Sequence, residues 1–236
     1  MTTALITGAN KGLGRETARR LAEQGWTVLL GARDAERGRA AAADLAAGSA
    51  DVRFVPLDVT DDDSVGAAAD EVARTVGHLD VLVNNAGIIG PLVEPTATTP
   101  ADFLAAFGVN LLGPVRVTRA FLGLLEKTDL PRIVMVSSGM GSLAVTTDPD
   151  RFESTLHGLV YPSSKAALNM VTTQYAKALP GWKVNAVDPG YTATDLNGHR
   201  GNQTVEVGAT AIVAMATLGA DGPTGGFFDK DGPVPW

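Results

Sequence analysis

The sequence predicts an α/β fold in which helices cover both faces of one doubly wound parallel sheet. Short apolar segments rich in Val, Leu and Ile alternate with longer segments whose apolar residues recur at helical spacing. The apolar segments are continuous rather than alternating with polar residues, which is typical of strands buried on both faces. Because the composition of the 236 residues shifts nowhere as it would at a linker, we expect a single domain over residues 1–236.

The first half of the chain contains four strand segments separated by three helix segments. The strands are expected at 3–8, 26–33, 52–59 and 79–85, and the helices at 11–25, 34–48 and 61–77. Gly25 marks the end of the first helix, and Asp34 carries the short carboxylate of an N-cap before the second. The acidic residues 61–63 favour the start of the third helix because they lie at its positive end.

The second half of the chain continues the alternation. Strands are expected at 132–138 and 183–190, with a short one at 226–229, and helices at roughly 100–127, 161–179 and 204–218. Pro162 is tolerated only in a first helical turn, so the helix that contains it must begin close to Tyr161. Segments 139–160 and 191–203 show neither periodicity and are expected to be loops.

The composition excludes several classes of protein. The formal net charge of −7 argues against a nucleic-acid partner, because phosphate backbones need clustered Lys and Arg. The absence of cysteine excludes disulfides, thiolate catalysis and cysteine-ligated zinc, and the three histidines share no metal-ligand spacing, so we expect no metal site. No apolar run is long enough to span a membrane, and the N-terminus does not resemble a signal peptide, so a cytoplasmic protein is expected.

A glycine-rich turn, "TGANKGLG" at 7–14, lies between the first expected strand and the first expected helix. Gly8, Gly12 and Gly14 let the backbone turn tightly and approach a pyrophosphate, and the start of a helix offers free N–H groups and a positive dipole. The spacing differs from G-x-G-x-x-G. The alternative interpretation is a tight turn that binds no ligand.

Tyr161 and Lys165 are four residues apart, which places them on one face of a helix. A free tyrosine has a pKa of about 10 and is a poor acid–base catalyst at neutral pH. A neighbouring ammonium stabilises the phenolate and makes the group useful for proton transfer. The alternative is an ordinary polar pair on the surface of an amphipathic helix.

Further motifs follow the glycine turn in a fixed order. They are "NNAG" at 84–87, Asn110, "VSS" at 136–138, Tyr161-x3-Lys165 and "DPGYTAT" at 188–194. Together they resemble the short-chain dehydrogenases/reductases, and the "NKG" turn, the "ARD" at 32–34 and the long stretch before the tyrosine are similar to carbonyl-reductase-like members. The resemblance covers nearly the whole chain and implies a single-domain, Rossmann-type parallel sheet of about seven strands flanked by helices.

The resemblance implies an oxidoreductase that transfers a hydride between a nicotinamide coenzyme and a carbonyl or alcohol substrate. Tyr161 would donate or accept the proton, and Lys165 would bind the nicotinamide ribose and lower the pKa of the tyrosine. Ser138 would hydrogen-bond the substrate oxygen, and Asn110 would hold a water that connects Lys165 to solvent. The alternatives are a catalytically silent NADP-binding regulatory protein and a sugar-nucleotide epimerase, although the latter usually has a larger C-terminal region.

The sequence favours NADP(H) over NAD(H). Ala32 occupies about the place where NAD-dependent relatives carry an aspartate that binds the ribose 2′-hydroxyl. Arg33, Lys11 and Arg37 lie near it and offer charge-assisted hydrogen bonds to a 2′-phosphate. The alternative is that the two arginines are solvated surface charges, paired with carboxylates such as Asp34.

The remaining coenzyme contacts follow from the resemblance. Thr192 would hold the nicotinamide carboxamide and Thr194 would touch the pyrophosphate, unless 189–190 is only a Pro-Gly turn followed by two surface threonines. The full predicted coenzyme set is Gly8, Asn10, Lys11, Gly12, Leu13, Gly14, Arg33, Arg37, Asp58, Val59, Asn85, Ala86, Gly87, Tyr161, Lys165, Pro189, Gly190, Thr192 and Thr194. The loops 139–160 and 191–203 are expected on the substrate side, with a small molecule as the partner and either a monomer or a homo-oligomer as the assembly.

Overall fold

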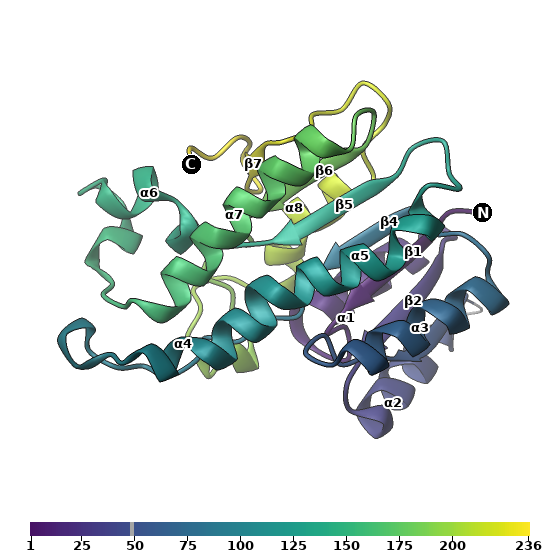
Figure 1. Cartoon of the computed structure of the whole chain (residues 1–236), viewed down its shortest axis with the longest axis horizontal. Helices are drawn as coiled ribbons and strands as arrows, with labels where there is room; N and C mark the ends of the chain where they lie inside the picture. The colour runs from purple at the N-terminus through teal and green to yellow at the C-terminus, as the bar shows by residue number, and fades with distance from the viewer. Residues whose placement is uncertain (48–49) are drawn as a thin grey trace.

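The computed structural model describes residues 1–47 and 50–236. Seven strands form one parallel sheet in the order β3-β2-β1-β4-β5-β6-β7, with helices on both faces (Figure 1). The strands are β1 (Thr3–Thr7), β2 (Thr27–Ala32), β3 (Val52–Pro56), β4 (Val81–Asn84), β5 (Arg132–Val136), β6 (Lys183–Val187) and β7 (Phe227–Phe228). The α-helices are α1 (Gly12–Ala22), α2 (Ala35–Ala46), α3 (Asp62–Thr75), α4 (Pro100–Phe107), α5 (Gly113–Leu125), α6 (Leu143–Thr147), α7 (Val160–Ala178) and α8 (Val205–Ala216). The predicted doubly wound parallel sheet is confirmed.

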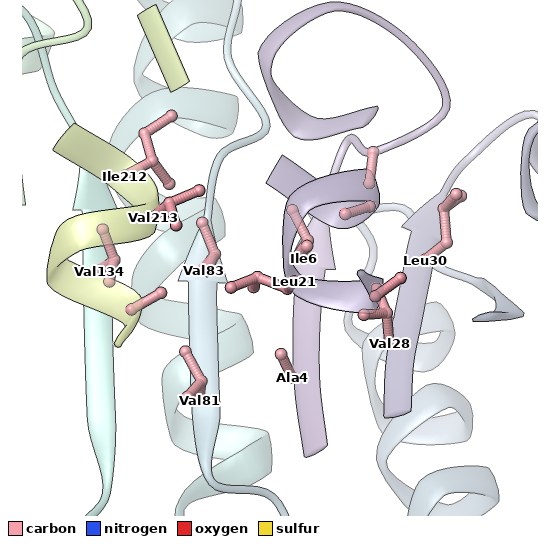
Figure 2. Close-up of a cluster of buried hydrophobic side chains, with 14 of the residues drawn as sticks. Ala4, Ile6, Leu21, Val28, Leu30, Val81, Val83, Val134, Ile212 and Val213 are labelled. Carbon is pink, nitrogen blue, oxygen red and sulfur yellow. The ribbon is translucent and has the colours of Figure 1, made fainter. Parts of the chain in front are cut away.

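The core consists of two apolar layers, one on each face of the sheet. Successive side chains of a strand point to opposite faces, so neighbouring residues belong to different layers. Ile6 of β1 lies beside Leu21 of α1 in one buried cluster, which also contains Val83 of β4 (Figure 2). Leu5 belongs to the second cluster, together with Phe121 of α5. Burial of both layers explains why the strands are continuous apolar segments in the sequence.

The order of the strands creates a crevice at one edge of the sheet. β1 lies between β2 and β4, with Ile6 paired with Leu30 on one side and with Val83 on the other. Strands β2 and β3 therefore extend the sheet on one side of β1, and β4 to β7 extend it on the other side. Ligands of such sheets bind beyond the carboxyl ends of the strands where the direction reverses. The glycine turn after β1 and the NNAG segment after β4 meet at this point.

The long helix expected over 100–127 is interrupted in the structure. α4 ends at Phe107, a π-helical turn follows over Gly108–Leu112, and α5 begins at Gly113. Pro114 follows directly in the first turn of α5, where its missing N–H and its ring disfavour a continuous α-helix. Such π-turns are frequent at functional sites, and this one carries Asn110.

The segment expected to be a loop over 139–160 contains short helices. A 3-10 turn (Gly139–Gly141), α6 and a second 3-10 turn (Phe152–Thr155) fill it. Ser142 caps α6 by accepting a hydrogen bond from Val145 N at 3.0 Å, and its hydroxyl donates to Pro235 O at 2.7 Å. The C-terminus thus anchors this excursion, which lies at the end of the molecule toward which the β5 arrow points (Figure 1).

Most helix ends lie within a few residues of their predicted positions. The prediction for the second helix extended to Gly48, which lies outside the described residues, and α2 ends at Ala46. α8 ends at Ala216, two residues before the predicted end. Across 1–47 and 50–236, no helix combines the length and the apolar composition needed to cross a bilayer.

Candidate active site

A cavity of about 590 Å³ lies at the carboxyl ends of the central strands. Its lining includes fifteen of the residues predicted to bind the coenzyme: Gly8, Lys11, Gly12, Leu13, Gly14, Arg33, Asp58, Val59, Asn85, Ala86, Gly87, Tyr161, Lys165, Pro189 and Thr194. Gly190 and Thr192 line a second cavity beside it. Asn10 and Arg37 line neither cavity. The fold therefore gathers most of the predicted set, from widely separated parts of the chain, around one crevice.

The glycine turn has the conformation that its sequence requires. Gly8 and Gly12 have φ values of 62° and 55°, in the left-handed region that residues with side chains rarely adopt. At Gly14, an added Cβ would lie 2.5 Å from the Asn85 side-chain nitrogen and 2.8 Å from Gly8 O, so only glycine fits between the turn and the NNAG segment. Lys11, the N-cap of α1, makes no side-chain cap hydrogen bond. The turn thus leaves an open cradle at a helix N-terminus, which suits a pyrophosphate.

Thr7 holds the NNAG segment against the end of β1. Its hydroxyl accepts hydrogen bonds from Asn85 N and Ala86 N, each at 2.9 Å, and the Asn85 side chain donates to Thr7 O at 2.7 Å. Asn85 and Ala86 are among the site residues predicted from the sequence, whereas Thr7 is not. Thr7 could have been identified from the sequence, because it is a polar residue at the carboxyl end of a largely apolar strand.

The predicted binding site for a 2′-phosphate is only partly assembled. The Arg33 side chain is 78% exposed at the rim of the first cavity, with Nε 3.9 Å from Asp58 Oδ2. Arg37 points elsewhere and pairs with Asp34, Nε lying 3.4 Å from Oδ2. Asp34 is also the N-cap of α2 and accepts a hydrogen bond from Arg37 N, so this contact lies at the start of the helix. Arg37 thus matches the alternative interpretation of a solvated surface charge.

Lys11, which lines the first cavity, contacts the segment after β6. Its ammonium donates to Asp195 Oδ2 at 2.7 Å, and Asp195 Oδ1 lies 2.9 Å from His199 Nε2. The hydrogen bond and the charge of Lys11 hold the pKa of Asp195 below its ordinary value. This long-range contact ties the glycine turn to the 3-10 turn at Asp195–Asn197.

Tyr161 and Lys165 occupy the first two turns of α7, as their spacing predicts. Lys165 is 3% exposed, and its Nζ lies 5.7 Å from the centre of the Tyr161 ring. The ammonium donates a hydrogen bond to Val136 O, at the end of β5, at 2.8 Å. Burial lowers the pKa of Lys165 to about 8, against the opposing effect of the Asp188 charge.

The expected lowering of the tyrosine pKa is not what the structure gives. Burial raises the pKa of Tyr161 to about 12, the hydroxyl of Ser138 opposes this shift, and the charge of Asp188 adds to it. The physical reason is that the Lys165 ammonium bonds to Val136 O and lies beside the ring, so desolvation of the phenolate dominates. The phenol is therefore protonated throughout the neutral range.

A second cavity, of about 380 Å³, adjoins the first, and Tyr161 is among the residues that line both. Ser138, just after β5, lines this second cavity, and its hydroxyl accepts a hydrogen bond from Met140 N at 3.2 Å. Thr192 also lines it, is 4% exposed, and donates to Pro189 O at 3.0 Å while accepting from Gln203 Nε2 at 2.9 Å. The excursion 139–160 and the segment 191–203 both contribute to its walls.

Asn110 fixes the segment after the NNAG motif. Its amide donates to Ile88 O at 2.8 Å and to Ser164 Oγ at 3.0 Å, and its oxygen accepts from Ile88 N at 2.9 Å. A Cβ placed on Gly87 would lie 3.5 Å from Asn110 Oδ1 and 3.6 Å from Lys165 Nζ, so these two groups meet beside Gly87. The contacts with Ile88 and Ser164 were not predicted, because they depend on the π-turn.

The chain is similar to known proteins over nearly its whole length. A family model described as short chain dehydrogenase matches residues 2–204. (+)-Neomenthol dehydrogenase from Arabidopsis thaliana is 33% identical over 96% of this chain and 95% of that protein. The structure of salutaridine reductase from Papaver somniferum, 31% identical, superposes with a TM-score of 0.83 over 96% of this chain and 99% of that one. NADPH-bound carbonyl reductase from chicken fatty liver, 28% identical, gives 0.88 over 100% and 99%. The chain therefore belongs to the short-chain dehydrogenase family of oxidoreductases, whose members transfer a hydride between a carbonyl or alcohol substrate and a nicotinamide coenzyme.

Proposed function

We propose that this chain is an NADPH-dependent carbonyl reductase in which Tyr161 donates the proton to the substrate oxygen. The observation that carries the proposal is the position of Tyr161, whose titratable side chain is among the residues that line both cavities. The first cavity has the glycine cradle and a volume of about 590 Å³, and the second has the mostly apolar walls of a small-molecule pocket. A group at their boundary lies beside both reactants.

The preference for NADPH rests on the charges around the first cavity. β2 ends in the buried Ala32, so no acid stands there to hold a ribose 2′-hydroxyl, and Arg33 follows at the rim. Lys11 lines the same cavity. Among the similar structures, the chicken carbonyl reductase is NADPH-bound, and an alcohol dehydrogenase from Thermococcus sibiricus, 26% identical, is complexed with 5-hydroxy-NADP.

The bound coenzyme supplies the hydride, and the residues of the chain supply the proton and the orientation. The phenol of Tyr161 is protonated at neutral pH and acts as the general acid that protonates the oxygen of the reduced carbonyl. Ser138 holds that oxygen by a hydrogen bond as negative charge develops on it. Lys165 binds the ribose of the nicotinamide and places a positive charge beside the phenolate left on Tyr161.

Coenzyme consumption with defined substrates tests this proposal. NADPH and NADH oxidation are measured separately over a panel of aldehydes, ketones, quinones and steroids. We expect at least one carbonyl class to be reduced, with a higher kcat/KM for NADPH than for NADH. Equal or better use of NADH would overturn the coenzyme assignment. Binding of NADPH without reduction of any carbonyl would instead support a regulatory protein.

A further inference from the structure

Three carboxylates line the second cavity, and two of them, those of Asp188 and Glu153, flank Gly139. Asp188 follows β6, and Glu153 lies on the 3-10 turn Phe152–Thr155 of the excursion. A Cβ placed on Gly139 would lie 2.9 Å from Asp188 Oδ2 and 3.1 Å from Glu153 Oε1. Both oxygens therefore lie within about 3 Å of one point, although the two residues come from separate segments. Neither was identified as a site residue from the sequence.

Asp188 has no cationic partner of its own. Its side chain is 6% exposed and lines the cavity, yet it forms no ion pair with a Lys, Arg or His among residues 1–47 and 50–236. Gly190 N donates to its Oδ1 at 2.9 Å. Burial raises the pKa of Asp188, hydrogen bonds from Gly190 and Gly139 oppose the shift, and the charge of Glu153 adds to it. A cation placed between the two carboxylates removes this unfavourable burial and repulsion.

Three positive side chains lie near the cavity, and only Arg151 pairs with either carboxylate among the described residues. Lys165 is bonded to Val136 O and faces the first cavity. Arg151 lies on the surface, with Nε 3.5 Å from the outer oxygen of Glu153, and does not line the cavity. Arg200 lines the outer part, is exposed, and donates to Asn197 O at 3.0 Å. Within residues 1–47 and 50–236, none of the three forms an ion pair with Asp188, although the charge of Asp188 acts on Lys165.

Two aromatic rings lie next to the carboxylates. Phe152 precedes Glu153 in the chain, and Tyr191 lies three residues after Asp188. Their ring centroids are 5.8 Å apart with planes inclined at 37°, and both rings are exposed and line the second cavity. The faces of aromatic rings attract alkylammonium groups, and this attraction is strongest where water is excluded.

We propose that the second cavity selects carbonyl substrates that also carry a protonated amine. The ammonium lies against Asp188 and Glu153, and its N-alkyl groups contact the rings of Phe152 and Tyr191. The carbonyl group then lies toward Tyr161, on the wall shared by the two cavities. The inference rests on the proposed carbonyl reductase and names its substrate class, and its tests separate the two.

A pair of matched ketones tests the selection. 3-(Dimethylamino)propiophenone carries a protonated amine, and 4-methyl-1-phenylpentan-1-one has the same skeleton with carbon in place of nitrogen. We expect kcat/KM with NADPH to favour the amine, and the ratio of the two values to fall about tenfold in Glu153→Gln, which keeps the shape of the side chain and removes its charge. Glu126→Gln removes the same charge from the exposed end of α5, outside both cavities, and should keep the wild-type ratio. An unchanged ratio in Glu153→Gln overturns the inference.

Direct binding keeps the inference testable without turnover. Benzyltrimethylammonium is titrated calorimetrically into the wild-type protein saturated with NADPH. We expect binding that weakens about tenfold in Glu153→Gln and is retained in Glu126→Gln. Reduction of neutral ketones without binding of this cation rejects the ammonium site and leaves the carbonyl reductase standing. Binding of the cation without reduction of any ketone supports the ammonium site and rejects the carbonyl reductase.

Discussion

Lys165 Nζ lies 5.7 Å from the centre of the Tyr161 ring and donates its hydrogen bond to Val136 O rather than to the phenol. The two side chains are therefore neighbours without being bonded partners. Burial acts on them in opposite directions, since it raises the pKa of the phenol to about 12 and lowers the pKa of the ammonium to about 8. The pair therefore combines the protonated phenol of Tyr161 with the ammonium of Lys165, which loses its charge just above neutral pH.

The pH dependence of carbonyl reduction follows from these two values. Reduction needs protonated Tyr161, present below about 12, and charged Lys165, present below about 8. The kcat/KM for a ketone should be flat near neutral pH and should decrease as the pH rises through the lower of the two values. A pH profile of kcat/KM reports these groups in the free enzyme. A profile that stays flat far above the pKa of Lys165 would contradict the assignment.

Alanine substitutions of Arg33 and Arg37 provide a matched test of the coenzyme site. Arg33→Ala should weaken NADPH binding about tenfold, with little effect on NADH, because it removes a charge-assisted hydrogen bond to the 2′-phosphate. Arg37→Ala should leave the NADPH Kd nearly unchanged, since Arg37 pairs with Asp34 outside the cavity. Fluorescence titration of both variants with both coenzymes measures this. Equal losses in the two variants would show that Arg37 moves to the phosphate.

Gly14 and Gly123 test the close approach of the glycine turn to the NNAG segment. Gly14→Ala forces its Cβ against the Asn85 side chain and Gly8 O, and should lower the free energy of unfolding by about 1–3 kcal/mol. Gly123→Ala in α5 meets nothing within 4 Å and should raise it by about 0.5–1 kcal/mol. Urea denaturation of the two variants should therefore give shifts of opposite sign, and a Gly14 variant as stable as the wild type would contradict the observed packing.

Substitution of Asn110 tests whether the hydrogen bonds made from the π-turn stabilise the fold. Asn110→Ala leaves Ile88 N, Ile88 O and Ser164 Oγ without this partner in a buried place, and should lower the free energy of unfolding by about 2–4 kcal/mol. Asn110→Asp keeps the acceptor for Ile88 N but loses both donated hydrogen bonds, so its stability should not recover to the wild-type value. Wild-type stability of the alanine variant would show that these contacts do not hold the segment.

The strands and the centre of the site were predictable from the sequence because their signals are local. Leu5 and Ile6 belong to a continuous apolar run, which is what burial on both faces selects. Tyr161 and Lys165 share a helix face through their spacing alone. Gly14 was predicted from its place in a turn, and the structure gives the physical reason as contact with Asn85.

The features that were missed depend on contacts between distant segments. Lys11 bonds to Asp195, and the carboxylates of Asp188 and Glu153 both lie near Gly139. Neither relationship has a spacing that could be read along the chain. The contact of Arg37 with Asp34 depends on the geometry of the α2 N-terminus, and the role of Arg37 at the phosphate stays a prediction. The pKa of Tyr161 was predicted in the wrong direction, since the sequence reveals the nearby lysine but not the depth of burial.

The most direct test of the account is Tyr161→Phe, assayed for both coenzyme binding and turnover. The substitution removes only the phenolic hydroxyl, so the Lys165 ammonium, the glycine cradle and the second cavity remain in place. We predict an NADPH Kd close to that of the wild type and a kcat for ketone reduction lower by about 10²–10⁴-fold, the usual contribution of a general acid. Turnover at the wild-type rate, with the coenzyme bound, would show that the proton comes from another group.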